Sequence, residues 1–317
     1  MSSLIDTVIE APIVTSFSRL GYELRSRSER WQPLTSCDLT GRVVAITGAT
    51  SGIGLAAARM FARAGATLVI TGRRAEKNRA AVRELLASSG NQNVSQIAAD
   101  MGEMDEVQIL AEELLAGFDR LDILIHNAGA LTNPRRTTSA GTEATIASQV
   151  VGPFLLTHLL MDRLGKAGGA RVLTMSSGGM YGSGLSVSNL EMSEATYNGT
   201  KQYAKAKRAQ VTLNAMWAQR HPEVIFHALH PGWVETPGVE DAIPGFAKLM
   251  GPILRTPAQG ADTLVWLACD PEAGRSNGKF WHDRRQRAIH KLGSTRSSDT
   301  PAKRDALWDW VETAAGI

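Results

Sequence analysis

The chain has 317 residues, of which 43% are hydrophobic and 21% charged, as in an ordinary soluble globular protein. Its 34 basic and 31 acidic residues give a net charge of +3, which is too small to indicate a nucleic-acid partner. The first residues lack the basic start and the small-residue cleavage site of a signal peptide, and no charge-free apolar run reaches the length of a membrane span. We therefore expect a cytoplasmic protein.

The two cysteines, Cys37 and Cys269, fit neither a metal-ligand spacing nor a disulfide framework. We interpret both as reduced thiols and expect no metal site. Arginines also cluster in two places, which we interpret as solvated faces: Arg25, Arg27 and Arg30, then Arg284, Arg285 and Arg287.

The segment before residue 41 forms an N-terminal arm, residues 1–40. Apolar side chains of residues 4–22 fall near one helical face, which Pro12 interrupts. This pattern predicts helices that dock on the main domain. The alternative, contact of residues 1–30 with a membrane surface, stays open because arginines follow the apolar stretch.

From residue 41, short β-branched runs alternate with segments of helical period. The strands are expected at residues 43–47, 67–71, 94–100, 122–127, 171–176 and 224–230. This alternation predicts the α/β class, as a single Rossmann-type, doubly wound parallel sheet with helices on both faces. The domain is expected to span 41–290, with a substrate flap at 234–257 rich in Pro, Gly and apolar residues. A C-terminal tail and helix follow at 291–317.

A glycine-rich turn joins the first strand to the first helix of this domain. Gly48, Gly52 and Gly54 would let the backbone approach a pyrophosphate closely, and the following helix would point its N–H groups at that anion. The second strand ends in Gly72-Arg73-Arg74, and no acidic residue occurs between Leu55 and Ala75. NAD-specific sites normally place a carboxylate there, whereas an arginine suits the 2′-phosphate of NADP. We therefore expect NADP(H) rather than NAD(H).

These motifs resemble the short-chain dehydrogenase/reductase family. TGATSGIG (47–54), Asp100, HNAG (126–129), SSGG (176–179) and HPGWVET (230–236) occur in the family's order, with His126 in place of an asparagine. Further stretches over most of the chain resemble one group within it. The resemblance implies cofactor contacts by Gly48, Ser51, Gly52, Ile53, Gly54, Arg73, Asp100, Met101, Asn127, Ala128, Gly129, Tyr203, Lys207, Pro231, Gly232, Val234 and Thr236.

The family's Tyr-x-x-x-Lys pattern occurs twice, as Tyr197 with Lys201 and as Tyr203 with Lys207. The family carries small and apolar residues at fixed positions after the lysine. Counting from Lys207 reproduces them, whereas counting from Lys201 puts a lysine on the buried face. Asn198 and Gly199 also indicate a loop before the helix. We therefore assign Tyr203 and Lys207 to the catalytic set, with Ser177 as its serine.

The resemblance implies hydride transfer between NADP(H) and a carbonyl or alcohol, with Tyr203 as general acid or base. The ammonium of Lys207 is expected to lower the pKa of this tyrosine, and Ser177 to bind the substrate oxygen. An alternative is a regulatory or scaffold protein that binds NADPH with little turnover.

Three further expectations concern the surroundings of the site. Gln149 stands where the family often has an asparagine that helps hold a relay water, and we do not count it as catalytic. Trp233, Trp281 and the apolar flap suggest a lipophilic substrate, while His282 and His290 are expected to be structural. Family members commonly form dimers or tetramers, so a homo-oligomer is compatible, but no feature of this sequence fixes the number.

Overall fold

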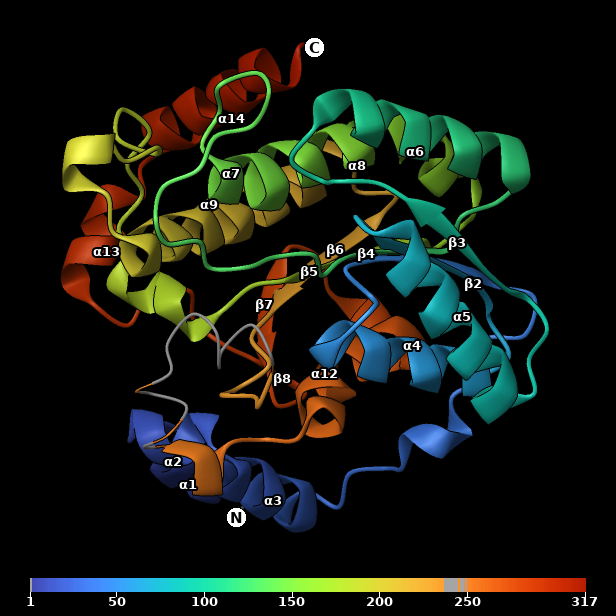
Figure 1. Ribbon diagram of the computed structural model, residues 1–317. Coiled ribbons are helices and arrows are strands. Elements are labelled where there is room, and N and C mark those ends of the chain that lie inside the picture. The colour runs from blue at the N-terminus through green and yellow to red at the C-terminus, as the bar shows by residue number, and fades with distance from the viewer. Residues whose placement is uncertain (1, 237–244, 246–247, 249) are drawn as a thin grey trace.

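A computed structural model describes residues 2–236, 245, 248 and 250–317 (Figure 1). Its sheet has eight strands in the order β3-β2-β1-β4-β5-β6-β7-β8, parallel except for the last pair. The strands are β1 (Val43–Thr47), β2 (Thr67–Gly72), β3 (Val94–Ala98), β4 (Ile123–His126), β5 (Arg171–Met175), β6 (Ile225–Leu229), β7 (Lys279–His282) and β8 (Arg285–Gln286). The six predicted strands are confirmed, and β7 and β8 were not predicted.

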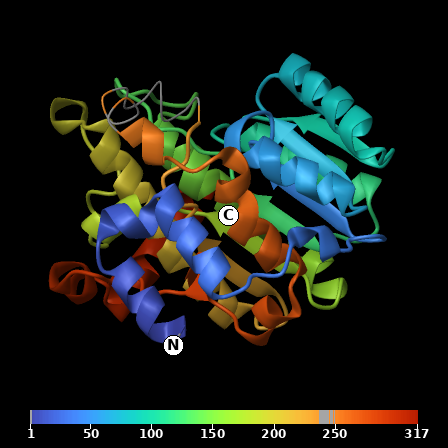
Figure 2. The same cartoon turned by 90° about the horizontal axis from the view of Figure 1, so that it is seen from below.

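Helices cover both faces of the sheet, as the alternation predicted (Figures 1 and 2). One face carries α4 (Gly52–Arg63), α5 (Ala75–Ser89) and α12 (Pro257–Cys269). The other carries α6 (Met104–Gly117), α7 (Ala144–Ile146), η2 (Ala147–Val151), α8 (Gly152–Lys166), α9 (Gly199–Arg220) and α14 (Pro301–Ala315). Shorter turns are η1 (Leu34–Ser36), η3 (Gly178–Gly182), η4 (Glu194–Thr196), η5 (Gly251–Ile253), η6 (Pro271–Arg275) and α13 (Gly293–Ser298).

The two apolar cores follow from the period of two along each strand. In β1, Val44 and Ile46 point into the core under α4 and α12, and Val43 and Ala45 into the core under α6 and α8. The stretch Ala144–Lys166 is long and apolar enough to span a membrane, but most of it is buried here. Its composition is therefore that of a core helix, because it lies between the sheet and α14.

The N-terminal arm forms α1 (Ser2–Glu10), α2 (Ile13–Phe17) and α3 (Arg19–Ser28), with the predicted interruption at Pro12. In Figure 1 the three helices lie at the bottom of the molecule, below α12. Phe17 is buried against residues of the main domain, so the arm docks as expected.

The interpretation of both arginine clusters as solvated faces is wrong for Arg25, Arg284 and Arg287. Arg25 is fully buried and donates to Asp6, Glu10 and Asp283. Arg284 and Arg287 have side chains 8% and 10% exposed, paired with Asp262 and Asp6 respectively. Arg27 does remain exposed. Helical period alone could not separate these arginines, because their carboxylate partners come from distant segments.

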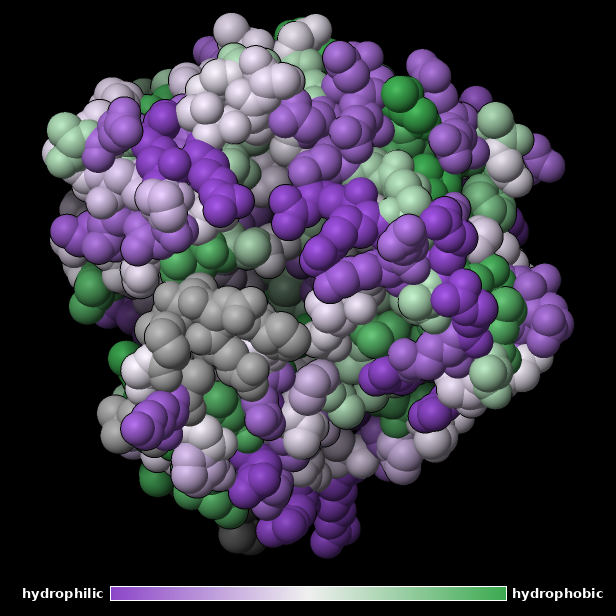
Figure 3. Space-filling model, in the orientation of Figure 1, coloured by the Kyte–Doolittle hydropathy of each residue, from purple (hydrophilic) through white to green (hydrophobic). Residues whose placement is uncertain are grey.

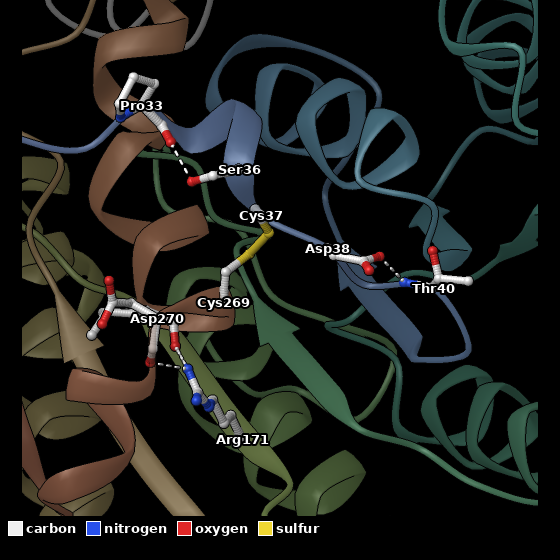
Figure 4. Close-up of a disulfide and its surroundings, with 9 residues drawn as sticks. Pro33, Ser36, Cys37, Asp38, Thr40, Arg171, Cys269 and Asp270 are labelled. Atoms are coloured by element: carbon white, nitrogen blue, oxygen red, sulfur yellow. Dashed lines mark hydrogen bonds between the residues drawn. A yellow bond between two sulfur atoms is a disulfide. The ribbon is translucent and has the colours of Figure 1, made fainter.

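The interpretation of the cysteines as free thiols is also wrong in this structure, where a disulfide joins Cys37 to Cys269 (Figure 4). Their Cα atoms are 5.7 Å apart although 232 residues separate them in sequence. The bond ties the segment between the arm and β1 to the end of α12. Beside it, Arg171 donates to the carbonyl oxygen of Asp270. Spacing rules could not find this pair, because only the fold brings the two residues together.

Candidate active site

The predicted site residues gather where the carboxyl ends of β1, β4, β5 and β6 meet. These strands are neighbours in the sheet and run parallel, so the loops that follow them share one edge. The glycine turn follows β1, residues 127–129 follow β4, Ser177 follows β5, and residues 230–236 follow β6. One edge of the sheet therefore collects motifs that are up to 180 residues apart.

In the glycine turn, the backbone that follows β1 lies very close to the backbone that follows β4. Gly48 has φ +69°, and a Cβ added to it would lie 2.7 Å from the Cα of Ala128. A Cβ on Gly54 would lie 2.2 Å from the carbonyl oxygen of Gly48. Ser51 precedes α4 without capping it, so the first N–H groups of that helix, including those of Ile53 and Gly54, remain for another acceptor.

The segment after β4 holds the turn in place. The Asn127 side chain donates to the carbonyl oxygens of Thr47 and Gly48, at 3.0 Å each. The backbone N–H groups of Asn127 and Ala128 both donate to the hydroxyl of Thr47. Through these contacts, Asn127 and Ala128 fix the shape of the glycine turn. Gly129 lies against Gln149 on η2.

Arg73, at the end of β2, extends into solvent with its side chain 70% exposed. Its nearest ion-pair partner is Asp100 after β3, at 3.6 Å, and the carboxylate of Asp100 also accepts from the backbone N–H of Gly102. An exposed guanidinium at this edge is free to take an anionic ligand. Met101 differs, because its side chain is buried in the core and contributes only backbone to this edge.

Ser177 begins the loop after β5 and faces the site, whereas Ser176 is turned inward. The Ser176 hydroxyl is buried and donates to the carbonyl oxygen of Lys207. The Ser177 hydroxyl accepts from the N–H of Gly179, and it lies near enough to the Tyr203 hydroxyl to lower the pKa of that tyrosine, against the larger effect of burial. The structure therefore brings the second serine of the pair, as predicted, to the tyrosine.

Tyr203 and Lys207 lie one turn apart on α9, and the Lys207 ammonium is 5.2 Å from the centre of the Tyr203 ring. Burial raises the pKa of Tyr203 to about 12, opposed by the Ser177 hydrogen bond. Burial lowers the pKa of Lys207 to about 7, and its Nζ donates to the carbonyl oxygen of Met175 at 2.8 Å. The expected lowering of the tyrosine pKa is therefore not present in the protein alone, because burial outweighs the hydrogen bond with Ser177.

Tyr197 has different surroundings. Its hydroxyl donates to the carboxylate of Glu143 and lies 3.0 Å from both oxygens of Thr132. Helix α9 begins after it, at Gly199, capped by the Asn198 side chain. The loop predicted from Asn198 and Gly199 is confirmed, and Tyr197 lies outside the group formed by Ser177, Tyr203 and Lys207.

The side chain of Arg255 supports the turn after β6. Gly232 has no room for a side chain, since a Cβ there would lie 2.3 Å from Nε of Arg255. Arg255 is 1% exposed and donates to the carbonyl oxygen of Pro231. Val234 is buried and pairs with Arg255 through backbone hydrogen bonds between Glu235, Trp233 and Arg255. The Thr236 methyl group faces Gly52, so this turn closes toward the glycine turn.

Two residues that depart from the family pattern are buried beside the site. The Gln149 side chain donates to the carbonyl oxygen of Ala130, and the backbone carbonyl oxygen of Gln149 accepts from the Gln210 side chain at 2.6 Å. His126 hydrogen-bonds with Thr157 on α8, and burial lowers its pKa to about 3, so it is neutral. Both residues therefore have structural contacts of their own.

The substrate side is described in part. Residues 237–244, 246–247 and 249 of the predicted flap lie outside the described residues. Trp281 is buried in the core beside Trp266 and His227, so the suggestion that it faces a ligand is wrong. Trp233 is half-buried in the turn after β6. His290 pairs with Asp299, in keeping with a structural role.

Sequence reasoning missed Phe17, His230 and Arg255, which lie directly behind the site. The ring of Phe17 is 4.2 Å from that of His230, and His230 accepts from the N–H of Gly178, next to Ser177. No local pattern marks the contacts of these residues, because their partners are 24 to more than 200 positions away along the chain.

Comparisons with known proteins agree with this geometry. Residues 42–244 match the short chain dehydrogenase family. Dehydrogenase/reductase SDR family member 12 of Homo sapiens is 38% identical over 278 residues, covering 87% of each chain. Retinol dehydrogenase 12 of Bos taurus is 34% identical, over 78% of this chain and 80% of its own.

Solved structures share the fold. A short chain dehydrogenase/reductase family protein superposes with a TM-score of 0.62 and 26% identity, over 77% of this chain and 96% of its own. A short chain dehydrogenase of Escherichia coli CFT073, complexed with NADPH, has a TM-score of 0.64 and 24% identity, over 78% of this chain and 98% of its own. The chain belongs to the short-chain dehydrogenase/reductase family of oxidoreductases.

Proposed function

We propose that the protein transfers a hydride between NADP(H) and a carbonyl/alcohol pair, with Tyr203 as general acid or base. The observation that carries the proposal is the convergence of Ser177 and Lys207 on Tyr203, at the sheet edge that also holds the glycine turn. This combination gives one hydroxyl to transfer a proton, a second to bind the reacting oxygen, and a cation beside them.

The residues present fit a dinucleotide. The glycine turn is a cradle that any Cβ would fill, and the N-terminus of α4 next to it offers N–H groups to a pyrophosphate. The exposed Arg73 suits a 2′-phosphate, and no carboxylate between Leu55 and Ala75 competes for a ribose hydroxyl. When bound, NADPH supplies the hydride, which the side chains of the protein cannot provide.

The pKa values favour the reductive direction. With a pKa of about 12, Tyr203 is protonated at neutral pH and is ready to donate a proton to a carbonyl oxygen that gains negative charge. Ser177 stabilises the same oxygen by a hydrogen bond. Lys207, with a pKa of about 7, returns a proton toward Tyr203 after the transfer.

We further propose a lipophilic substrate. The support is the half-buried indole of Trp233 in the turn after β6, and the retinol dehydrogenases among the relatives. The test is NADPH oxidation by the purified protein with a panel of lipophilic aldehydes and ketones, with the Tyr203→Phe variant as control. Turnover that Tyr203→Phe removes supports the proposal, and turnover that survives in this variant contradicts the role of Tyr203.

The alternative function is NADPH binding without useful turnover. The burial of Tyr203 and Lys207 is compatible with it, because buried ionisable groups also occur in structural positions. NADPH binding without oxidation of NADPH across the whole panel would favour this alternative over the enzyme.

The N-terminal arm supports a second proposal, contact with a membrane surface. Its helices bury Asp6 and Arg25, yet Val8, Leu20 and Val14 are more than half exposed. Exposed arginines Arg19 and Arg27 accompany these apolar side chains. Figure 3 shows hydrophobic and hydrophilic residues interleaved over the arm, at the lower left. Apolar side chains with nearby cations match the interface of an anionic bilayer.

Co-sedimentation with vesicles of phosphatidylcholine and phosphatidylserine tests the membrane contact. We expect the double variant Val14→Glu/Leu20→Glu to lose binding, and the matched variant Ile109→Glu to keep it, because Ile109 is an equally exposed apolar residue on α6. Equal binding by all three proteins, or none by the wild type, would contradict the proposal.

The cytoplasmic location predicted from the sequence remains a proposal. Cytosolic proteins generally keep their cysteines reduced. Alkylation of Cys37 and Cys269 at the moment of cell lysis therefore provides a test. Free thiols would support the cytoplasm, whereas a disulfide would indicate an oxidising compartment.

A further inference from the structure

We propose that the N-terminal arm is part of the active site, and that Phe17 is the positioning residue that joins the Ser177 loop to the turn at 231–236. The inference rests on the proposed function of that site. The arm lies outside residues 42–244, the range over which the chain matches the family model.

The ring of Phe17 supports the Ser177 loop from behind. Phe17 is 4% exposed, and its ring centre is 4.2 Å from that of His230, edge to face. A Cβ on Gly178, the residue after Ser177, would lie 2.6 Å from the Phe17 ring. His230 in turn accepts from the Gly178 N–H at 3.1 Å. Ser177 is therefore followed by a residue that is held between the ring of Phe17 in the arm and the ring of His230, the first residue after β6.

The backbone of Phe17 supports the turn after β6. Its carbonyl oxygen accepts from the N–H of Trp233 at 2.7 Å and from Nε of Arg255 at 3.1 Å. Arg255 also donates to the carbonyl oxygen of Pro231 and lies under Gly232. One arm residue thus contacts both segments that are predicted to meet the substrate and the nicotinamide.

A buried ionic cluster fixes the position of Phe17. Asp283 is 1% exposed and accepts from both Arg25 and Arg255. Both arginines also donate to the carbonyl oxygen of Ser16, next to Phe17. Charges this deeply buried hold their geometry tightly, because the loss of one partner leaves another charge unpaired in the protein interior.

The contacts predict a loss of positioning when the ring is removed. Phe17→Ala opens a gap behind Gly178 and His230, so the Ser177 loop can shift relative to Tyr203. Displacements of about 1 Å at reacting groups can reduce rates by about 100-fold. The expected effect is therefore on kcat and on NADPH binding, at temperatures where the variant is still folded.

The experiment compares Phe17→Ala, Phe17→Leu and Phe61→Ala with the wild type. Phe61 is fully buried at the far end of α4 from the glycine turn, so its truncation also removes a core ring. Thermal unfolding of each variant sets a common temperature well below every melting point. At that temperature, kcat, KM and the dissociation constant of NADPH are measured for each protein.

We expect Phe17→Ala to lower kcat at least about tenfold and to weaken NADPH binding, with partial recovery in Phe17→Leu, while Phe61→Ala lowers only the melting temperature. Equal kinetics and binding in Phe17→Ala and Phe61→Ala would overturn the inference. If the wild type binds NADPH but shows no turnover, the proposed function fails, and the NADPH dissociation constants of the variants still decide the inference. If the wild type does not bind NADPH, both fail.

Discussion

Tyr197 and Tyr203 are six residues apart and each precedes a lysine by four positions, yet they lie in different regions of the molecule. Tyr203 is on α9, between Ser177 and Lys207, with a pKa raised to about 12. Tyr197 is before the helix, and its hydroxyl donates to the carboxylate of Glu143, which is fully buried. The same short motif therefore lies in the proposed proton-transfer group in one region and in a loop in the other.

The hydrogen-bond partners of a tyrosine, rather than the Tyr-x-x-x-Lys motif, therefore determine whether its hydroxyl can transfer a proton. A hydroxyl that already satisfies a buried carboxylate cannot transfer a proton to a substrate without leaving that charge unpaired. Among the described residues, the pKa of Tyr203 is lowered by the Ser177 hydroxyl, which can turn to a substrate oxygen, and not by a buried carboxylate. Activity and stability should therefore respond in opposite ways to loss of the two hydroxyls.

The largest expected effect is that of Tyr203→Phe on activity. Loss of the general acid should lower kcat by about 10²–10⁴-fold, since a positioned proton donor contributes that much. The free energy of unfolding should not fall, because no buried charge depends on this hydroxyl. Steady-state NADPH oxidation measures kcat, and chemical denaturation measures the free energy of unfolding. A Tyr203→Phe variant that keeps most of its kcat would contradict the proposed role of Tyr203.

The second prediction concerns the proposed selection of NADP(H) over NAD(H) by Arg73. Arg73→Glu should weaken NADPH binding about tenfold or more, because it removes a charge-assisted contact to the 2′-phosphate and adds repulsion. NADH binding should change far less. Fluorescence titration with both nucleotides measures this effect, with Arg83→Glu on α5 as the exposed control. Equal losses for NADPH and NADH would argue against the role of Arg73.

The third prediction is the converse of the first. Tyr197→Phe should lower the free energy of unfolding by about 2 kcal/mol, the usual value of a hydrogen bond to a charged group, because Glu143 loses a partner. The kcat value should stay near that of the wild type. Urea denaturation and the NADPH oxidation assay test the pair of statements, and a large loss of kcat here would reverse the assignment of the two tyrosines.

The last prediction concerns the pH dependence of stability at Lys207. Its pKa falls from an ordinary 10.5 to about 7 because burial penalises the charged form. The unfolded chain therefore binds more protons at Lys207 than the folded protein does between about pH 7 and 10.5. The free-energy cost of burying this lysine falls as the pH rises through that range, so the protein becomes more stable. Relative to Lys207→Met, the wild type should gain stability between pH 7 and 9. Parallel melting curves of the two proteins would contradict the shifted pKa.

Several features of the fold and site were predictable because they depend on local sequence. Alternation of β-branched and helical segments located six strands, and the glycine spacing located the turn at Gly48. The position of Asn198 located the start of α9, and with it the choice of Tyr203 over Tyr197. The reason is that turns, caps and amphipathic periods are fixed by neighbours within a few positions.

The failed predictions share a different physical origin. Cys37 and Cys269 were left unpaired and Arg25 was placed in solvent, because one cysteine pairs with the other across 232 residues and Arg25 meets Asp283 from the far end of the chain. The strand β7 was missed because it has only four residues and continues directly into a turn at Asp283. Periodicity carries no information on such distant pairing.

Short-range geometry and motif order were enough to predict six strands of the sheet, the glycine turn and the tyrosine that lies with the serine and lysine. Only the tertiary structure decided that the arm turns its charges inward, and that Phe17 contacts both the Ser177 loop and the turn after β6. A buried charge is stable only when an opposite charge meets it, and which segments meet is a property of the folded chain.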